Sequence, residues 1–259
     1  MTHHILTASD GPIFTITFNR PERRNALTHE MYDAIADAMI AAEANTSVRA
    51  IVFRGSDGCF SAGNDMIDFL DRPPHLFCTP GTPPPVERVI QALHDAKKPL
   101  IAVVDGYAIG LGTTMLFHCD LVYASERSVF GTPFTALSVT PECGSSFLIP
   151  RMMGYPQAAE LLMLSDRVSA DDALRMGFVT RVFPADTLKA EADKKIQKLV
   201  SLPPQAVLTA KALMRRAPES LQKRMQIEGE YFTARLDMPE FKEAANAFLE
   251  KRSPDFSNF

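Results

Sequence analysis

A single carboxylate stands out in an apolar stretch of the chain. In the segment TPFTALSVTPECGSS, residues 132–146, Glu142 is the only charged side chain. The helix dipole favours an acid at the start of a helix, and the Pro-Glu pair before Cys-Gly-Ser-Ser suits that role. An apolar environment also raises the pKa of a carboxyl, which suits a general base acting at neutral pH. Both interpretations stay open at this level.

Two glycine-containing segments indicate where such a base could act. FSAGND, residues 60–65, and GYAIGLG, residues 106–112, each follow a β-branched run. Backbone N–H groups at the starts of helices can stabilise a developing oxyanion, and they need no particular side chain. The alternative for FSAGND is a tight turn with positive φ at Gly63. GYAIGLG lacks the GxGxxG spacing of a dinucleotide-binding fold.

Two further polar residues, His118 and Asp120, have side chains that often take part in catalysis. They lie where a predicted helix meets the next predicted strand. A polar side chain at such a junction commonly satisfies backbone groups. We therefore expect buried or capping roles for both residues.

The elements that would position these residues alternate between strands and helices. Residues 1–25 alternate as a hairpin does, with a turn at Asp10-Gly11-Pro12. Helical spacing follows over residues 28–43, with Thr28 as the N-cap. Strands are predicted at VRAIVFRG, KPLIAVVDG and DLVYAS, and helices at residues 86–97, at RMMGYPQAAELLMLS and from Leu188 onward. Such strand–loop–helix units predict an α/β fold, with sites at the carboxyl ends of strands.

The segment DRPPHLFCTPGTPPP, residues 71–85, contains six prolines and is predicted to form a loop. Long loops of this kind often border a ligand site.

Composition excludes several classes of function. The chain has 46% hydrophobic and 22% charged residues, a net charge of −4 and a pI near 5.9. We therefore expect neither a nucleic acid nor a membrane surface as partner. The four cysteines form no CxxC pair, so neither a disulfide framework nor a zinc site is predicted. The N-terminal residues do not resemble a signal peptide, and a cytoplasmic protein is expected.

Four segments in order resemble one known family. NRPERRNAL, FSAGND, DGYAIGLG and FGTPFTALSVTPECGSS follow one another as in the crotonase (enoyl-CoA hydratase/isomerase) superfamily, from about residue 12 to the end. The resemblance implies an α/β crotonase fold, with a spiral of ββα units over residues 1–200. It also implies a helical oligomerisation region over residues 201–259, in a homotrimer or dimer of trimers. The expected substrate is an acyl-CoA thioester, with no metal or redox cofactor.

The resemblance also assigns roles to individual residues. The thioester oxygen would be held by the backbone amides of Ala62 and Leu111. Arg24 would lie near phosphate, together with Lys251 and Arg252 of a neighbouring subunit; a solvated surface is the alternative for these cations. Asp65 would be a turn or N-cap acid without a chemical role. The full set implied for the coenzyme A portion is Arg24, Ala26, Asp65, Met66, Ile67 and Lys251.

The chain departs from the hydratases of this family at two positions. Their two glutamates correspond to Thr114 and Phe134 here, and neither side chain can activate water or deliver a proton at neutral pH. The pattern TPFTALSVTPECGSS instead resembles peroxisomal-type Δ3,Δ2-enoyl-CoA isomerases, whose catalytic carboxylate corresponds to Glu142. The order here is Glu-Cys-Gly, where those enzymes have Glu-Gly-Cys.

We therefore expect an enoyl-CoA isomerase in which Glu142 shuttles one proton. The apolar side chains expected to raise the pKa of Glu142 are Phe134, Leu137, Val139 and Phe147. The alternatives are an enoyl-CoA hydratase, other acyl-CoA chemistry of the superfamily, and a non-catalytic acyl-CoA-binding protein.

Overall fold

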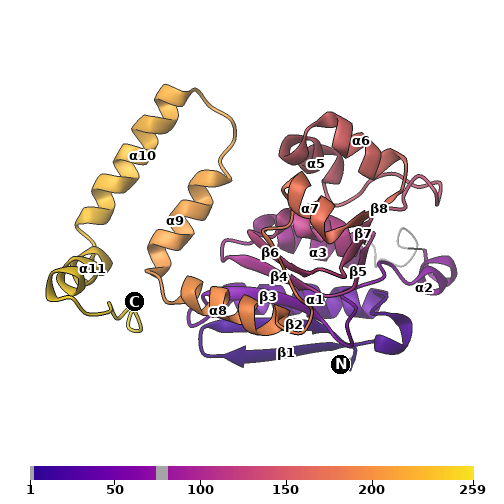
Figure 1. Ribbon diagram of the computed structural model, residues 1–259, viewed down its shortest axis with the longest axis horizontal. Coiled ribbons are helices and arrows are strands. Elements are labelled where there is room, and N and C mark those ends of the chain that lie inside the picture. Colours follow the sequence, from indigo (N-terminus) through magenta and orange to yellow (C-terminus); the bar gives the residue numbers. More distant parts are fainter. Residues whose placement is uncertain (1–2, 74–80) are drawn as a thin grey trace.

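A six-stranded sheet forms the centre of the molecule (Figure 1). The computed structural model describes residues 3–73 and 81–259. The predicted N-terminal hairpin is confirmed, since β1 (Ile5–Asp10) pairs antiparallel with β2 (Ile13–Phe18). The other neighbours in the sheet pair in parallel, in the order β2, β3 (Ala50–Gly55), β4 (Leu100–Val104), β6 (Leu121–Ser125) and β9 (Arg181–Phe183).

A second sheet has three short strands, β5 (Tyr107–Ile109), β7 (Val129–Gly131) and β8 (Arg167–Ser169). The β5 segment was expected to be loop, and this expectation is wrong. Its backbone pairs on one side with β7 and on the other through a bridge between Ala108 and Ser61. The glycine-rich sequence gives no local sign of these long-range partners.

The first long helix forms as predicted. Helix α1 (His29–Ala44) begins after Thr28, whose hydroxyl accepts a hydrogen bond from the Met31 amide at 3.3 Å. The remaining helices up to residue 200 are η1 (Pro21–Arg23), α2 (Met66–Asp71), α3 (Pro85–Asp95), α4 (Leu111–Thr114), η2 (Met115–His118), α5 (Ser145–Met153), α6 (Tyr155–Met163), α7 (Ala170–Met176) and α8 (Leu188–Val200).

The central sheet is apolar on both faces because helices cover both. Successive side chains of a strand point to opposite faces. In β4, Leu100, Ala102 and Val104 join the core cluster that includes α1 and α3. Ile101 and Val103 join a smaller cluster with residues of α8. The continuous apolar run LIAVV is thus explained by burial on both sides.

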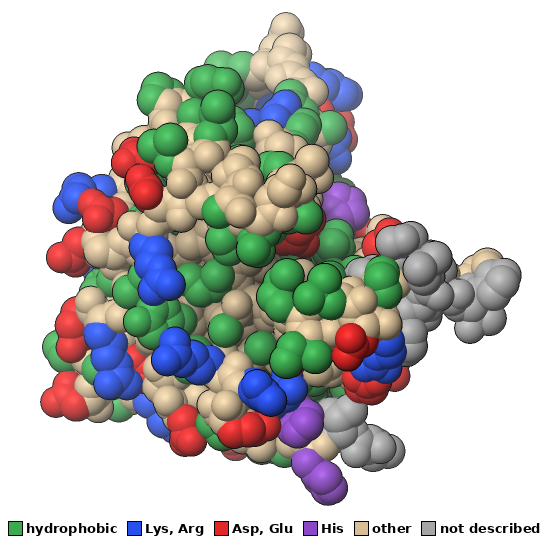
Figure 2. All heavy atoms as spheres, turned by 90° about the vertical axis from the view of Figure 1, so that its right-hand side faces the viewer, with side chains coloured by type: hydrophobic (Ala, Val, Ile, Leu, Met, Phe, Trp, Pro, Cys, Tyr) green, Lys and Arg blue, Asp and Glu red, His purple; other side chains and the backbone are tan. Residues whose placement is uncertain are grey.

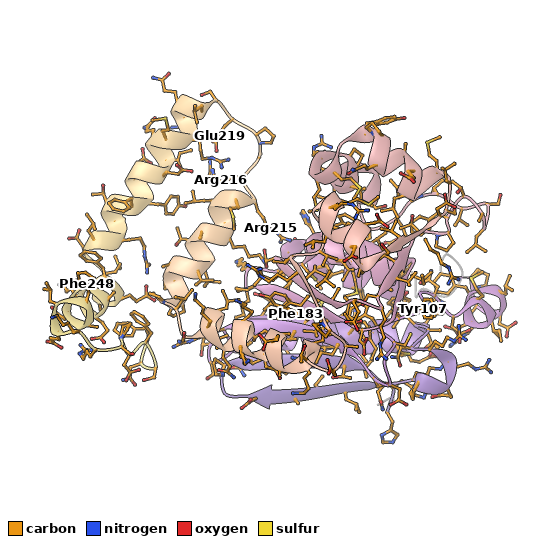
Figure 3. All side chains as sticks on the ribbon, viewed as in Figure 1. Tyr107, Phe183, Arg215, Arg216, Glu219 and Phe248 are labelled. Atoms are coloured by element: carbon orange, nitrogen blue, oxygen red, sulfur yellow. The ribbon has the colours of Figure 1, made fainter. Side chains whose placement is uncertain are left out.

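The last helices extend away from the sheet. Figure 1 shows α9 (Pro204–Met214), α10 (Leu221–Leu236) and α11 (Pro239–Glu250) apart from the layered core. Arg215, after α9, reaches back and donates to the His118 carbonyl at 2.7 Å (Figure 3). Many large apolar side chains of this region are exposed, among them Met214, Leu221, Met225, Phe232, Phe248 and Leu249. No described helix is both long and apolar enough to cross a bilayer.

Candidate functional site

Glu142 lies in the turn that leads into α5. The Thr114 hydroxyl donates to its Oε1 at 2.5 Å. Its other oxygen, Oε2, is buried and has no hydrogen-bond partner within residues 3–73 and 81–259. Burial raises the pKa of Glu142 to about 7, and the bond from Thr114 opposes that shift. The N-cap of α5 is Gly144, without a side-chain hydrogen bond, so the helix-capping interpretation of Glu142 is wrong.

The apolar surroundings of Glu142 differ from those predicted. Phe134 is buried, but Leu137, Val139 and Phe147 are 49%, 54% and 56% exposed. The expectation for these three residues is therefore wrong. Leu137 and Val139 belong to a tight turn, closed by the Val139 amide donating to the Phe134 carbonyl at 2.9 Å.

Two buried residues lie close to the Glu142 carboxylate instead. The Tyr32 phenol, from α1, has a pKa raised first by burial and then by the nearby Glu142 charge. The same two causes, in the same order, raise the pKa of the Cys143 thiol. The carboxylate is thus enclosed by side chains from α1, α4 and its own turn.

The turn that follows Glu142 is contacted by His118, the last residue of η2. Cys143 has φ +56°, an uncommon conformation for a residue with a side chain. His118 Nε2 lies 2.9 Å from the Cys143 carbonyl oxygen, and burial lowers the pKa of this imidazole. Asp120 accepts from the Leu100 amide at 2.8 Å and from Lys211 Nζ at 2.7 Å. The structural roles predicted for His118 and Asp120 are confirmed.

The two glycine-containing loops, residues 60–65 (the first loop) and residues 106–112 (the second loop), are in backbone contact with each other. The Ser61 amide donates to the Tyr107 carbonyl, and the Ile109 amide to the Ser61 carbonyl, both at 2.9 Å. Gly63 has φ +87°, as predicted, and an added Cβ would lie 2.8 Å from the Ile109 carbonyl oxygen. Only glycine allows the backbones to approach this closely.

The backbone amides of these loops correct one prediction. The Ala62 amide already donates to the Arg24 carbonyl at 2.9 Å, so Ala62 is not an open donor and its assignment is wrong. Two residues on, the Asn64 amide has no acceptor in the described part of the chain, and neither has the Leu111 amide at the start of α4. The first residues of a helix leave their N–H groups unpaired. Asn64 and Leu111 are therefore the available pair.

Glu142 is connected to both loops. The Tyr32 hydroxyl, close to Glu142, donates to Asn64 Oδ1 in the first loop. Thr114, which holds Glu142, belongs to the same short helix as Leu111 in the second loop. A buried carboxylate of raised pKa thus lies close to Tyr32, which is bonded to the first loop, and is bonded to Thr114 of the helix that begins at Leu111. Such an arrangement can remove a proton next to a carbonyl and stabilise the resulting oxyanion.

Apart from Lys251, the residues predicted for the coenzyme A portion lie near the first loop. Arg24 is exposed, with its guanidinium 5.8 Å from the centre of the Tyr107 ring. The Arg167 guanidinium lies 5.3 Å from the same ring, and sequence reasoning did not select it. The Ala26 carbonyl accepts from Arg20 at 3.0 Å.

Asp65 is the N-cap of α2, where its side chain accepts from the Ile67 and Asp68 amides and pairs with Arg20 at 2.5 Å. The predicted capping role is confirmed. The carboxylate is engaged by these partners. Met66 and Ile67 of α2 are exposed. Helix α2 lies on the right-hand side of Figure 1, the side that Figure 2 turns toward the viewer.

Lys251 is not brought together with the other predicted residues. It follows α11, at the opposite end of the molecule from α2 and from Tyr107 (Figures 1 and 3). Arg252 pairs with Glu243 and Glu250 of its own chain, both at 2.6 Å. A phosphate role for Lys251 therefore depends on a neighbouring subunit and stays a prediction.

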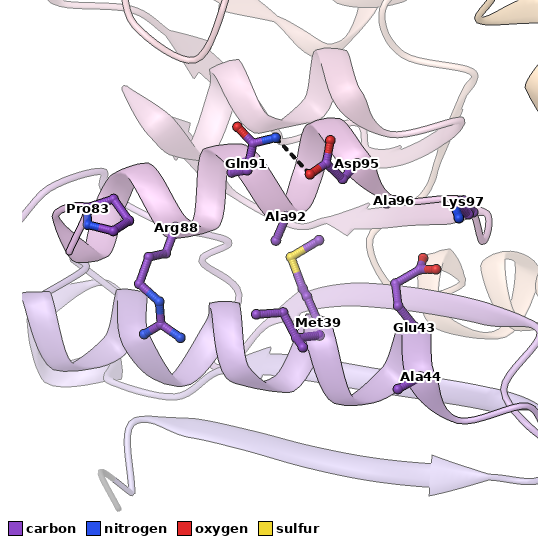
Figure 4. Close-up of a pocket in the computed structure, with 11 residues that line it drawn as sticks. Met39, Glu43, Ala44, Pro83, Arg88, Gln91, Ala92, Asp95, Ala96 and Lys97 are labelled. Atoms are coloured by element: carbon purple, nitrogen blue, oxygen red, sulfur yellow. Dashed lines mark hydrogen bonds between the residues drawn. The ribbon is translucent and has the colours of Figure 1, made fainter. Parts of the chain in front are cut away.

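A hollow of the molecule lies away from the candidate site. A hollow of about 540 Å³ lies between α1 and α3, with Met39 and Glu43 on one side and Arg88, Gln91 and Asp95 on the other (Figure 4). No predicted site residue lines it. Nor do the described residues contain a cluster of three or more potential His, Cys, Asp or Glu metal ligands.

Fold and site together define the class of this protein. It has the α/β crotonase fold, as predicted, with a buried carboxylate beside two paired glycine loops. More particularly, the chain belongs to the enoyl-CoA hydratase/isomerase family, whose model matches residues 9–258.

Individual relatives support this assignment. Enoyl-CoA delta isomerase 2 of Rattus norvegicus is 38% identical over 213 residues, which cover 82% of this chain and 54% of the rat protein. The chain thus spans about half the length of that relative. Enoyl-CoA delta isomerase 3, peroxisomal, of Mus musculus is 34% identical over 253 residues, covering 96% and 79%. A solved structure from Magnetospirillum magneticum AMB-1, described as an enoyl-CoA hydratase/carnithine racemase, has a TM-score of 0.93, 38% identity and full coverage of both chains.

Proposed function

We propose that this chain is a Δ3,Δ2-enoyl-CoA isomerase with Glu142 as its only acid–base group. The proposal rests on the hydrogen bonding, the burial and the pKa of the Glu142 carboxylate. One oxygen is held by Thr114, the other is buried without a partner in the described part of the chain, and the pKa is raised to about 7. A group with this pKa can take a proton and return it at neutral pH. The isomerase names of two relatives support the same conclusion.

The reaction needs one base and an oxyanion site. Glu142 removes a proton from C2 of the 3-enoyl thioester, and the C–H electron pair moves into a dienolate. The negative charge reaches the thioester oxygen, where the Asn64 and Leu111 amides donate to it. The protonated Glu142 then delivers the proton to C4, which leaves the double bond between C2 and C3. Removing one donor from such a site typically costs about 10²–10³ in rate.

The same residues disfavour hydration. Adding water across the double bond needs one group to activate the water and one to deliver a proton. Thr114 is buried with its hydroxyl donated to Glu142, and Phe134 carries no ionisable group. Oε2 of Glu142 is buried as well. When the substrate binds, its acyl chain must therefore displace the side chains that cover this oxygen.

The test compares wild type with Glu142→Gln on a 3-enoyl-CoA, following the absorbance of the conjugated 2-enoyl product. We expect wild type to turn over and the variant to lose at least about 10³-fold in kcat, as for a removed acid–base group. Equal rates would eliminate Glu142 as the base. Faster hydration of crotonyl-CoA than isomerisation would identify a hydratase. Tight thioester binding without turnover of either substrate would identify a binding protein.

We further propose that residues 201–259 mediate self-association, as a trimer or a dimer of trimers. The exposed apolar side chains of α9, α10 and α11 support this role, because large exposed apolar patches commonly mark interfaces. Light scattering of the purified chain checks the mass. The cytoplasmic location stays a prediction.

A further inference from the structure

Thr114 directs its hydroxyl at the carboxylate of Glu142. The side chain is fully buried, and its Oγ1 donates to Glu142 Oε1 at 2.5 Å. Its backbone is fixed by the Thr114 amide donating to the Gly110 carbonyl at 2.9 Å. The adjacent Thr113, also fully buried, bonds elsewhere, with its hydroxyl donating to the Ala108 carbonyl and accepting from the Gly131 amide at 3.1 Å. These neighbours therefore differ in the one contact that concerns Glu142.

We infer that Thr114 is a positioning residue that gives the two oxygens of Glu142 different tasks. Oε1 is held by the Thr114 hydroxyl, and Oε2 alone takes the proton from C2 and returns it to C4. This inference rests on the proposed isomerase function and adds to it the atom that carries the proton and the residue that selects it.

The chemistry of the two groups supports this division. A hydroxyl has one proton to donate, and here it is directed at Oε1. Oε2 has no partner among the described residues, so it is the oxygen open to protonation. Fixing one oxygen also fixes the plane of the carboxylate. A base that must reach two carbons in succession gains from such orientation.

Helix α4 carries both Thr114 and the Leu111 amide of the proposed oxyanion site. Leu111 and Thr114 lie three residues apart, about one helical turn, so they are neighbours on the helix. The amide proposed to hold the thioester oxygen and the hydroxyl that holds the base therefore belong to one short element. A shift of α4 would move both together.

The electrostatic consequence can be measured. Donation by Thr114 favours the ionised carboxylate and opposes the effect of burial on the pKa of Glu142. The other titratable groups near the carboxylate are Tyr32 from α1 and Cys143 in the same turn. His118 of η2 contacts the Cys143 carbonyl behind them.

The experiment compares Thr114→Val with Thr113→Val as matched control. In Thr114→Val, the acid limb of the kcat/KM pH profile should move to higher pH by about one unit, the worth of one hydrogen bond to a charged group. Thr114→Ser should restore the wild-type limb. Thr113→Val should keep that limb even if it lowers stability. Thr114→Ala serves if the valine variant does not fold.

A label gives a second readout that a merely structural role would not change. With a C2-deuterated 3-enoyl-CoA in ordinary water, a fixed carboxylate returns part of the deuterium to C4. The fraction transferred should fall in Thr114→Val and not in Thr113→Val. An unmoved acid limb and unchanged transfer in a folded Thr114→Val variant overturn the inference. If Glu142→Gln retains full activity, Glu142 is not the base of the proposed isomerase, whereas loss of activity in Glu142→Gln with an unchanged Thr114→Val overturns only the inference about Thr114.

Discussion

The imidazole of His118 lies 2.9 Å from the carbonyl oxygen of Cys143. A carbonyl can only accept, so Nε2 carries the proton of this bond. The contact supports a residue with φ +56°, directly after Glu142. Although His118 lies outside the proposed proton path, it contacts the backbone of the residue that follows Glu142.

Replacing His118 by Leu should therefore lower both stability and activity. Leaving the buried carbonyl unsatisfied costs about 1–3 kcal/mol in the free energy of unfolding. We expect a fall in kcat of roughly tenfold, since a small misplacement of a catalytic group is costly. His118→Gln, which keeps an N–H donor, is the matched control. Urea denaturation and the isomerase assay measure the two effects, and a fully active leucine variant would contradict the positioning role.

The raised pKa of Glu142 predicts a pH-dependent gain of stability in Glu142→Gln. The folded pKa of about 7 exceeds the ordinary value of 4.5, so the folded state binds the proton more tightly. The carboxyl therefore destabilises the fold increasingly as pH rises from 4.5 to about 7, and above the folded pKa the loss of stability is constant. At pH 8 the variant should be more stable by roughly 3 kcal/mol, and at pH 5 by less than about 1 kcal/mol. Denaturation at both pH values checks this, and a pH-independent difference would refute it.

The Leu111 amide can be removed without removing the helix. Proline is tolerated at the first position of a helix, because the N–H there has no partner within the helix. Leu111→Pro should lower kcat by about 10²–10³, the usual cost of one oxyanion donor. Leu111→Ala loses the same buried side chain but keeps the amide. Similar kcat values for the two variants would argue against a donor at this position.

Arg24 should matter only when the substrate carries phosphate. For a 3-enoyl-CoA, Arg24→Ala should raise KM by about tenfold, the worth of one charge-assisted contact. For the corresponding pantetheine thioester, which lacks the phosphates, KM should not change. Arg23→Ala, an exposed neighbour, is the control. A rise in KM for both substrates would indicate a structural role for Arg24 instead.

The sequence predicts correctly those structural features that neighbouring residues define. The hairpin, the Thr28 cap, the Asp65 cap and the positive φ of Gly63 follow from turn and capping chemistry that neighbouring residues define. Glu142 was selected because it is a lone charge in an apolar segment. Its capping alternative is excluded by contacts that no local pattern reveals: Gly144 is the N-cap of α5, and the Glu142 side chain accepts from Thr114, 28 residues earlier.

The errors concern contacts between distant segments. Whether Ala62 or Asn64 offers an open amide depends on the Arg24 carbonyl, which no local pattern reveals. The β5 strand forms because β7 and Ser61 lie beside it. The sequence marks Thr114 only as the position of a missing carboxylate, because a threonine in a helix does not indicate what its hydroxyl contacts.

The close approach of the two loops has a consequence for mutational tolerance. An added Cβ at Gly63 would lie 2.8 Å from the Ile109 carbonyl oxygen, and one at Gly112 would lie 3.1 Å from Ser61. Each substitution would push the loops apart and widen the spacing of the Asn64 and Leu111 amides. In a saturation library screened for turnover, these two glycines should accept as few replacements as Glu142, although neither has a side chain to offer a substrate.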